Sequence, residues 1–125
     1  MTEKALLDRI DAYAQVIREH RPLTPNEVKE LDAYFRIGTT YTSNALEGNS
    51  LTLSETKVLL EDGITIGGKP IRDCYEATGH ARAYDYMLEI ARGGPLQFRE
   101  KDILRLHALF YGGIDPDHAG HYRED

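Results

Sequence analysis

Apolar residues recur every three or four positions over most of the chain, which is the spacing of one face of an α-helix. The first such stretch runs from residue 4 to about residue 20 and ends before Pro22, because proline disfavours helical backbone at the preceding residue. This pattern predicts an amphipathic helix. Its apolar stripe consists of Leu6, Ile10, Tyr13 and Ile17.

A second helical stretch begins at Thr24, which is followed by a proline and then by Glu27. Threonine can cap a helix, proline fits the first helical position, and a glutamate three residues after the cap can complete a capping box. The helical spacing then continues to Gly48, although Gly38 and its β-branched neighbours weaken the middle. One continuous helix and two shorter ones are both compatible with this stretch.

Two further capping boxes predict the starts of later helices. Thr52 with Glu55 opens a short helix that ends at Gly63, and Asp73 with Glu76 opens a long one. A last helix carries an apolar stripe and ends at two glycines, and residues 114–125 have the composition of a loop. The stripe of the last helix consists of Ile103, Leu106 and Phe110.

Between residues 64 and 71, Ile64-Thr65-Ile66 and Lys69-Pro70-Ile71 lie on either side of Gly67 and Gly68. Paired glycines tolerate the positive φ angles of a two-residue turn, so this segment predicts a small β-hairpin. Two glycines can also belong to a phosphate-binding loop, but no complete glycine-rich fingerprint is present. The expected fold class is therefore all-α, a helical bundle with one minor β-hairpin near residues 64–71.

Composition and charge restrict the function classes. The 125 residues, 41% of them hydrophobic, suit a single domain, and the formal net charge of −6 makes nucleic acid an unsuitable partner. The one cysteine, Cys74, is expected to be a small buried hydrophobe in a reducing compartment. The sequence has neither a secretory signal pattern nor an apolar run long enough to span a membrane, which predicts a cytoplasmic location without membrane contact.

Ser43 and Glu47 are the first candidate for a functional pair, because residues four positions apart lie on one face of a helix. Gly48 and Asn49 then tolerate left-handed backbone, which places Glu47 in the last helical turn. A carboxylate there faces the negative end of the helix dipole, so a cationic partner from elsewhere is expected. The alternative is that both are ordinary solvated helix residues.

Other residues with reactive side chains allow alternative interpretations. Residues 115–121 hold two carboxylates and two imidazoles, which suit either a divalent metal or, more commonly, a polar turn. His107 is either a general base or a hydrogen-bonded residue at the edge of the core. None of the common catalytic motifs is complete, so the sequence by itself assigns no catalytic residue and no metal ligand.

Three separated segments resemble Fic (Fido) domain proteins. The segment from Ser43 to Gly48, followed by Asn49, resembles their inhibitory-helix motif, (Ser/Thr)-x-x-x-Glu-(Gly/Asn). Two later segments resemble part of the Fic core, and the resemblance extends from about residue 35 to the end of the chain. These later segments are Leu106-His107 and Ala119-Gly120-x-Tyr122-Arg123.

The resemblance implies a specific chemistry. Fic proteins mostly transfer AMP from ATP to a hydroxyl side chain of a target protein, usually with Mg²⁺, and use the motif HPFx(D/E)GNGRxxR. By this resemblance, Glu47 pairs with the second arginine of that motif and blocks productive placement of the γ-phosphate, while Ser43 supports the contact. The residues that resemble the Fic core are expected to be structural; they are His107, Gly120, Tyr122 and Arg123.

The catalytic motif itself is missing from these 125 residues. Glu47-Gly48-Asn49 matches its acidic triplet in letters, but the histidine and phenylalanine that should precede the triplet are absent. The expected function is therefore the N-terminal, self-inhibitory half of a Fic-type protein adenylyltransferase, inactive alone and binding no cofactor alone. The alternatives are a separate antitoxin-like module that inhibits a Fic partner in trans and a metal-dependent hydrolase that uses residues 115–121.

The same resemblance implies an organisation and a set of partners. The chain is expected to be one unit, in which residues 1–50 are N-terminal helices with an inhibitory helix at about 39–48. Residues 51–125 are expected to be the N-terminal part of a Fic core. The implied partners are a target protein with a hydroxyl side chain, the C-terminal catalytic part of the Fic domain, and a second copy in a homodimer. ATP and Mg²⁺ are expected only in the complete protein.

Overall fold

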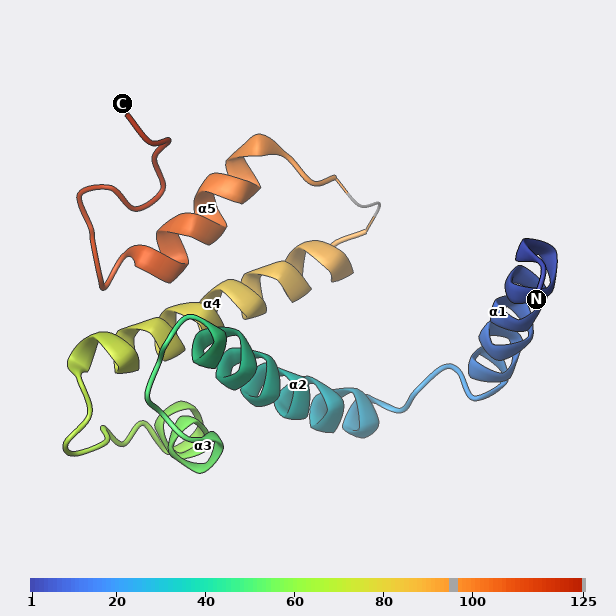
Figure 1. The fold of residues 1–125 in the computed structure, drawn as a ribbon, viewed down its shortest axis with the longest axis horizontal. Helices are drawn as coiled ribbons and strands as arrows, with labels where there is room; N and C mark the ends of the chain where they lie inside the picture. Colours follow the sequence, from blue (N-terminus) through green and yellow to red (C-terminus); the bar gives the residue numbers. More distant parts are fainter. Residues whose placement is uncertain (95–96, 125) are drawn as a thin grey trace. The chain divides into compact units, whose positions relative to one another are not determined.

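The computed structural model describes residues 1–94 and 97–124. Within these ranges the chain forms five α-helices and no strand, which confirms the all-α class (Figure 1). None of these helices is long and apolar enough to cross a membrane. The helices are α1 (Glu3–Glu19), α2 (Pro25–Leu46), α3 (Leu53–Asp62), α4 (Ile71–Arg92) and α5 (Glu100–Tyr111).

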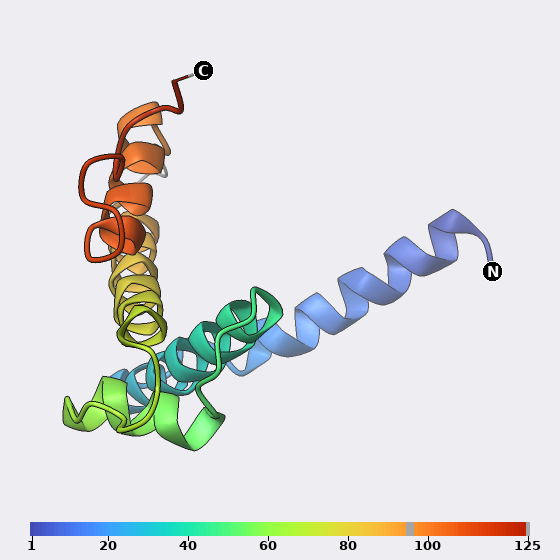
Figure 2. The same cartoon turned by 60° about the vertical axis from the view of Figure 1, so that its left-hand side comes forward.

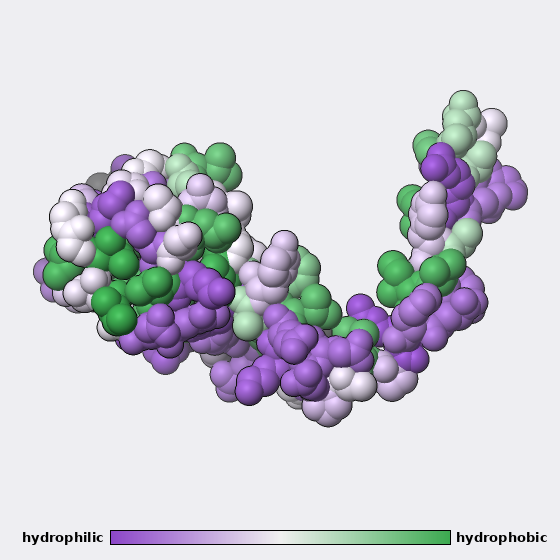
Figure 3. Space-filling model, turned by 90° about the horizontal axis from the view of Figure 1, so that it is seen from below, coloured by the Kyte–Doolittle hydropathy of each residue, from purple (hydrophilic) through white to green (hydrophobic). Residues whose placement is uncertain are grey.

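The chain divides into two compact units, residues 1–32 and residues 33–125. In the first unit, Thr2 caps α1 by accepting a hydrogen bond from the backbone N–H of Ala5. The predicted amphipathic helix is confirmed, yet none of its residues is buried. Apolar and charged side chains are both exposed along α1 in the space-filling view (Figure 3).

Helix α2 is continuous over 22 residues, so the structure selects one helix rather than two. The predicted capping box is present: Thr24 N–H donates to Glu27, and Glu27 N–H donates to the Thr24 hydroxyl. Gly38 does not interrupt the helix, since one glycine costs only about 1 kcal/mol of helix stability. The Thr42 hydroxyl donates back to the carbonyl of Gly38 at 2.9 Å, which accommodates this β-branched residue within the helix.

In the second unit, α4 is the helix on which the others pack. Helix α5 runs antiparallel beside it, because Gly79 approaches Phe110 while Tyr86, further along α4, donates to Asp102 near the start of α5. Figures 1 and 2 show the two helices side by side. A Cβ atom on Gly79 would lie only 2.4 Å from the carbonyl oxygen of Phe110. The absence of a side chain at Gly79 therefore sets how closely the helices approach.

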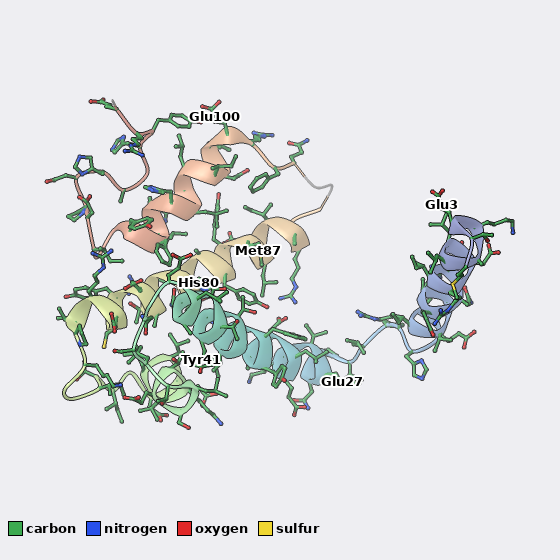
Figure 4. The ribbon with its side chains drawn as sticks, viewed as in Figure 1. Glu3, Glu27, Tyr41, His80, Met87 and Glu100 are labelled. Carbon is green, nitrogen blue, oxygen red and sulfur yellow. The ribbon has the colours of Figure 1, made fainter. Side chains whose placement is uncertain are left out.

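Side chains from the second half of α2 contact the middle of α4. Arg36 forms an ion pair with Asp85 at 2.8 Å, and Thr40 Oγ1 lies 3.1 Å from His80 Nδ1. The contacts thus proceed toward the start of α4 as α2 proceeds toward its end. In Figure 4, His80 lies where these two helices meet. The C-terminal end of α2 is consequently brought to the N-terminal end of α4.

Helix α3 packs against α4 over a small apolar core. As predicted, Thr52 and Glu55 form a complete capping box, and Gly63 ends the helix with a φ of 67°. Cys74 is a free, buried cysteine, which confirms its predicted packing role. The core consists of Leu51, Leu59, Cys74 and Ala77, with Ile66 partly buried against it.

The β-hairpin predicted near residues 64–71 does not form. Instead, Lys69 N–H donates to the carbonyl of Ile66 in a turn where Gly68 has a φ of 79°, and α4 begins at Ile71. Each arm offers only about three residues, and Pro70 has no N–H for a strand ladder. The glycines therefore make a turn, as predicted, but the flanking residues do not pair.

The capping box predicted at Asp73 is also wrong. Helix α4 begins three residues earlier, with Pro70 rather than Asp73 at the N-cap position, so Asp73 is the third helical residue. An acidic residue in that position normally accepts a hydrogen bond from the N-cap backbone N–H, which proline lacks. The Asp73 carboxylate instead accepts hydrogen bonds from Ser50.

Helix α5 ends at Tyr111 and is followed by Gly112, as predicted. The loop predicted over 114–125 is confirmed for residues 114–124, and Asp125 lies outside the described residues.

Candidate functional site

The end of α2 has the backbone geometry of a Schellman motif. Gly48 N–H donates to the carbonyl of Ala45 at 3.1 Å, and Asn49 N–H donates to the carbonyl of Asn44 at 3.0 Å. Gly48 has a φ of 91°, a conformation that glycine adopts without strain. The last helical residue is Leu46, so Glu47 lies directly after the helix and not in its last turn, where the sequence predicted it.

The carboxylate of Glu47 is exposed, and Ser43, one turn earlier, is half-buried. Within residues 1–94 and 97–124, no side chain forms a hydrogen bond or an ion pair with the Glu47 carboxylate. The cationic partner expected for it is thus not among the described residues. Ser43 and Glu47 still share one side of α2, where a group arriving from outside can reach both.

Glu76 on α4 is the acidic neighbour of Glu47. Burial is the main cause that raises the pKa of Glu76, and the negative charges of Asp73 and Glu47 raise this pKa further. The Arg72 guanidinium, 3.6 Å from the Glu76 carboxylate, acts in the opposite direction. The end of α2 therefore places an exposed carboxylate near a second, partly buried one, with Arg72 as the cation closest to Glu76.

Two residues after Glu47, the chain is attached to α4 by a set of hydrogen bonds that we call the Asp73 clamp. Asn49 Nδ2 donates to the backbone carbonyl of Asp73 at 2.9 Å. The Ser50 N–H, at 2.9 Å, and the Ser50 hydroxyl both donate to Asp73 Oδ2. Asn49 Oδ1 also accepts from Leu51 N–H, which fixes the amide orientation. The clamp consists of Asn49, Ser50 and Asp73.

Lys69 adds a second attachment beside the clamp. Its ammonium group donates to the carbonyl of Ser50 at 2.8 Å and lies 3.5 Å from the Glu55 carboxylate. The positions of Glu47 and Asn49 are consequently determined by contacts with α4 and its preceding turn as well as by α2 itself.

The clamp predicts an acid-sensitive local structure. The pKa of Asp73 is lowered, first by the Ser50 hydroxyl, which outweighs the opposing effect of burial, and further by the Ser50 N–H and the charges of Lys69 and Arg72. A lowered folded-state pKa contributes stability that is present above the ordinary pKa of about 3.9 and is lost as the pH falls through the lowered value. We expect the Ser50 amide proton to lose protection from exchange over that acidic range in NMR spectra.

The face of α2 toward α4 carries polar residues. Thr40 is fully buried and Asn44 is 4% exposed, and the Asn44 Nδ2 atom has no hydrogen-bond partner within the described part of the chain. His80, opposite Thr40, has its pKa lowered by burial and meets the Phe110 ring edge to face. Sequence reasoning missed Thr40, Asn44 and His80, although the i, i+4 spacing of the first two was a usable signal.

The residues that resemble the Fic core lie at α5 and the segment after it. Gly120 N–H donates to His107 Nδ1 at 2.9 Å, and the Tyr122 hydroxyl donates to Glu100 at the start of α5. The segment therefore returns along α5, as the ribbon shows (Figure 1). His107, Tyr122 and Arg123 line a common cleft of about 760 Å³. The structure thus brings these four residues together.

The loop 115–121 contains a local ion pair. His118 Nδ1 lies 2.9 Å from the Asp115 carboxylate, and this hydrogen bond raises the pKa of His118. In the described part of the chain, no group of three or more His, Cys, Asp or Glu side chains is arranged to hold a metal ion. These residues alone therefore do not fit a Mg²⁺ site.

No family model matches the chain. A protein adenylyltransferase Fic from Drosophila willistoni is 33% identical over 121 residues, covering 97% of this chain and 23% of that protein. The corresponding protein from Drosophila persimilis is 34% identical over 94 residues, which are 75% of this chain and 18% of that protein.

A solved structure has the same fold. A Fic domain containing signaling protein from Bacteroides thetaiotaomicron matches with a TM-score of 0.75 and 29% identity, over 86% of this chain and 40% of that one. The chain thus spans about a fifth of the length of the curated relatives it matches. It is a homologue of Fic-domain proteins, related over nearly its whole length to part of a Fic protein adenylyltransferase.

Proposed function

We propose that this chain is the inhibitory, N-terminal part of a Fic-type protein adenylyltransferase and that Glu47 is its inhibitory carboxylate. The observation that carries the proposal is the exposed Glu47 carboxylate at a rigid helix end, without an ion-pair partner among the described residues. Homology to proteins named as adenylyltransferases supports the reaction class.

In this proposal, Glu47 receives its cation from the catalytic motif, whose second arginine forms a bidentate ion pair with it. Such pairs are strong and geometrically selective, so a correctly placed Glu47 competes effectively with ATP for that arginine. Ser43 supports the contact from the same side of α2. Gly48 and Asn49 hold the helix end.

The remaining parts of the proposal follow from the same homology. ATP and Mg²⁺ belong to the complete adenylyltransferase, the substrate is a hydroxyl side chain of a target protein, and the catalytic part binds against this chain. His107, Gly120, Tyr122 and Arg123 stabilise the segment along α5, as the hydrogen bonds to His107 and Glu100 support. A homodimer, a cytoplasmic location and the division at residue 50 stay predictions.

The direct test uses a chimera in which this chain replaces the homologous stretch of the Drosophila willistoni protein. In this protein we expect Glu47→Gly to raise self-modification with labelled ATP roughly tenfold or more, because a hydrogen bond to a charged group contributes about 1.5–3 kcal/mol. The matched control is Glu19→Gly, which changes the exposed last residue of α1 and is expected to leave AMP transfer unchanged.

A folded Glu47→Gly chimera with unchanged AMP transfer would contradict the inhibitory role. The separate 125-residue chain provides the second arm. AMP transfer by this chain alone would contradict the absence of catalytic machinery. Inhibition in trans of a Fic enzyme that lacks its own inhibitory glutamate would favour an antitoxin-like module instead.

A further inference from the structure

We propose that Asp73 is a positioning residue for the inhibitory carboxylate: through the Asp73 clamp it holds the end of α2 against α4 and so fixes where Glu47 points. This inference rests on the proposed function and adds a residue to it. The sequence does not indicate this role, because Asp73 lies 26 positions after Glu47 and its pattern predicted a helix cap.

The clamp attaches the turn at two successive residues. The Asp73 backbone carbonyl accepts from the Asn49 side chain, and the Asp73 carboxylate accepts twice from Ser50. The Schellman hydrogen bonds connect the backbone from Asn44 to Asn49. Fixing Asn49 and Ser50 on α4 therefore fixes the direction of Glu47 as well.

The Asp73 carboxylate is suited to this task by its place in α4. Pro70 at the N-cap offers no N–H, so the carboxylate is free to bind Ser50. Asp73 is only 9% exposed, and its two Ser50 donors satisfy a charge that burial would otherwise disfavour. Its location in the first turn of α4 also places it at the positive end of the helix dipole.

Glu76 on α4 is a like-charged neighbour of Glu47. Burial is the main cause that raises the pKa of Glu76, and the negative charge of Glu47 adds to it, so Glu47 is not attracted to this carboxylate. The clamp therefore holds Glu47 where an incoming guanidinium can stabilise its carboxylate, whereas the neighbouring Glu76 does not.

The test compares Asp73→Ala with Asp73→Asn in the chimera described above. We expect Asp73→Ala to raise AMP transfer roughly three- to tenfold, since it removes two hydrogen bonds that restrain Glu47. Asp73→Asn keeps an oxygen that can accept from Ser50, so we expect a smaller rise. Asp62→Ala, at the exposed end of α3, is the matched control and is expected to cause no rise.

The double variant with Glu47→Gly separates positioning from general stability. If Asp73 acts through Glu47, Asp73→Ala adds no further AMP transfer once Glu47 is gone. Equal losses of AMP transfer in both backgrounds would mean a merely structural role and would overturn the inference. A rise with Glu47→Gly but not with Asp73→Ala would overturn it and leave the proposed function intact. No rise with Glu47→Gly would overturn both.

Hydrogen exchange of the 125-residue chain supplies the structural readout. In Asp73→Ala we expect the Ser50 amide to exchange faster, while amides in the middle of α4, such as that of Ala81, remain protected. An unchanged Ser50 exchange rate would overturn the inference, because the clamp would then not be what holds this turn.

Discussion

Replacing Gly79 with alanine is expected to destabilise the second unit by about 1–3 kcal/mol, the usual cost of overpacking a close contact. The added Cβ would lie 2.4 Å from the Phe110 carbonyl oxygen and 3.1 Å from that of Leu109. Both atoms belong to the backbone of α5, so no side-chain rotation relieves the clash. Helices α4 and α5 must therefore separate, which weakens the packing that holds the unit together.

Urea unfolding followed by circular dichroism measures this effect. Gly38→Ala is the matched control, because Gly38 is also inside a helix but a Cβ there meets no atom within 4 Å beyond the adjacent backbone of its own helix. We expect that control to stabilise the chain by up to about 1 kcal/mol, since alanine favours helix more than glycine does. Equal effects of the two substitutions would contradict the close approach of α4 and α5.

Replacing Leu59 with alanine is expected to cost about 2–5 kcal/mol of unfolding free energy, the range for large-to-small changes in protein cores. Leu59 is 7% exposed and belongs to the small core between α3 and α4. It also lines a cleft of about 620 Å³, so solvent can enter part of the space that the substitution opens. We therefore expect a value near the lower end of the range.

Leu53→Ala is the matched control for this substitution. Leu53 lies in the same helix but is 50% exposed, so its loss removes little buried surface. The expected change is below about 0.5 kcal/mol, as for surface substitutions generally. If Leu53→Ala cost as much as Leu59→Ala, the core assigned to α3 and α4 would be wrong.

Local signals predicted the helices well where capping residues mark the ends. The boxes at Thr24 and Thr52 and the left-handed glycines at 48 and 63 all occupy their predicted roles. Each of these signals depends on hydrogen bonds within four or five residues, which a sequence contains completely. The same signal was misleading at Asp73. The spacing of Asp73 and Glu76 fits a capping box, but α4 begins directly after Pro70.

Periodicity predicted helices but not which residues are buried. The helical spacing that continues to Gly48 does not identify the buried residues of α2: Leu46 is 87% exposed, whereas Thr40 and Asn44 are buried. Apolar spacing indicates which face can be buried, whereas the packing partner decides which face is. Here the partner is α4, whose His80 meets Thr40 with a polar contact.

For the candidate site, the sequence by itself determined the short-range features: a hydroxyl and a carboxylate four residues apart, and a glycine that ends the helix after them. Only the tertiary structure decided that the turn is attached to α4 through Asp73 and that Glu47 lies near Glu76. The physical reason is range. Caps and glycine turns are completed by neighbours in the chain, whereas the Asp73 clamp joins residues more than twenty positions apart, which only packing brings together.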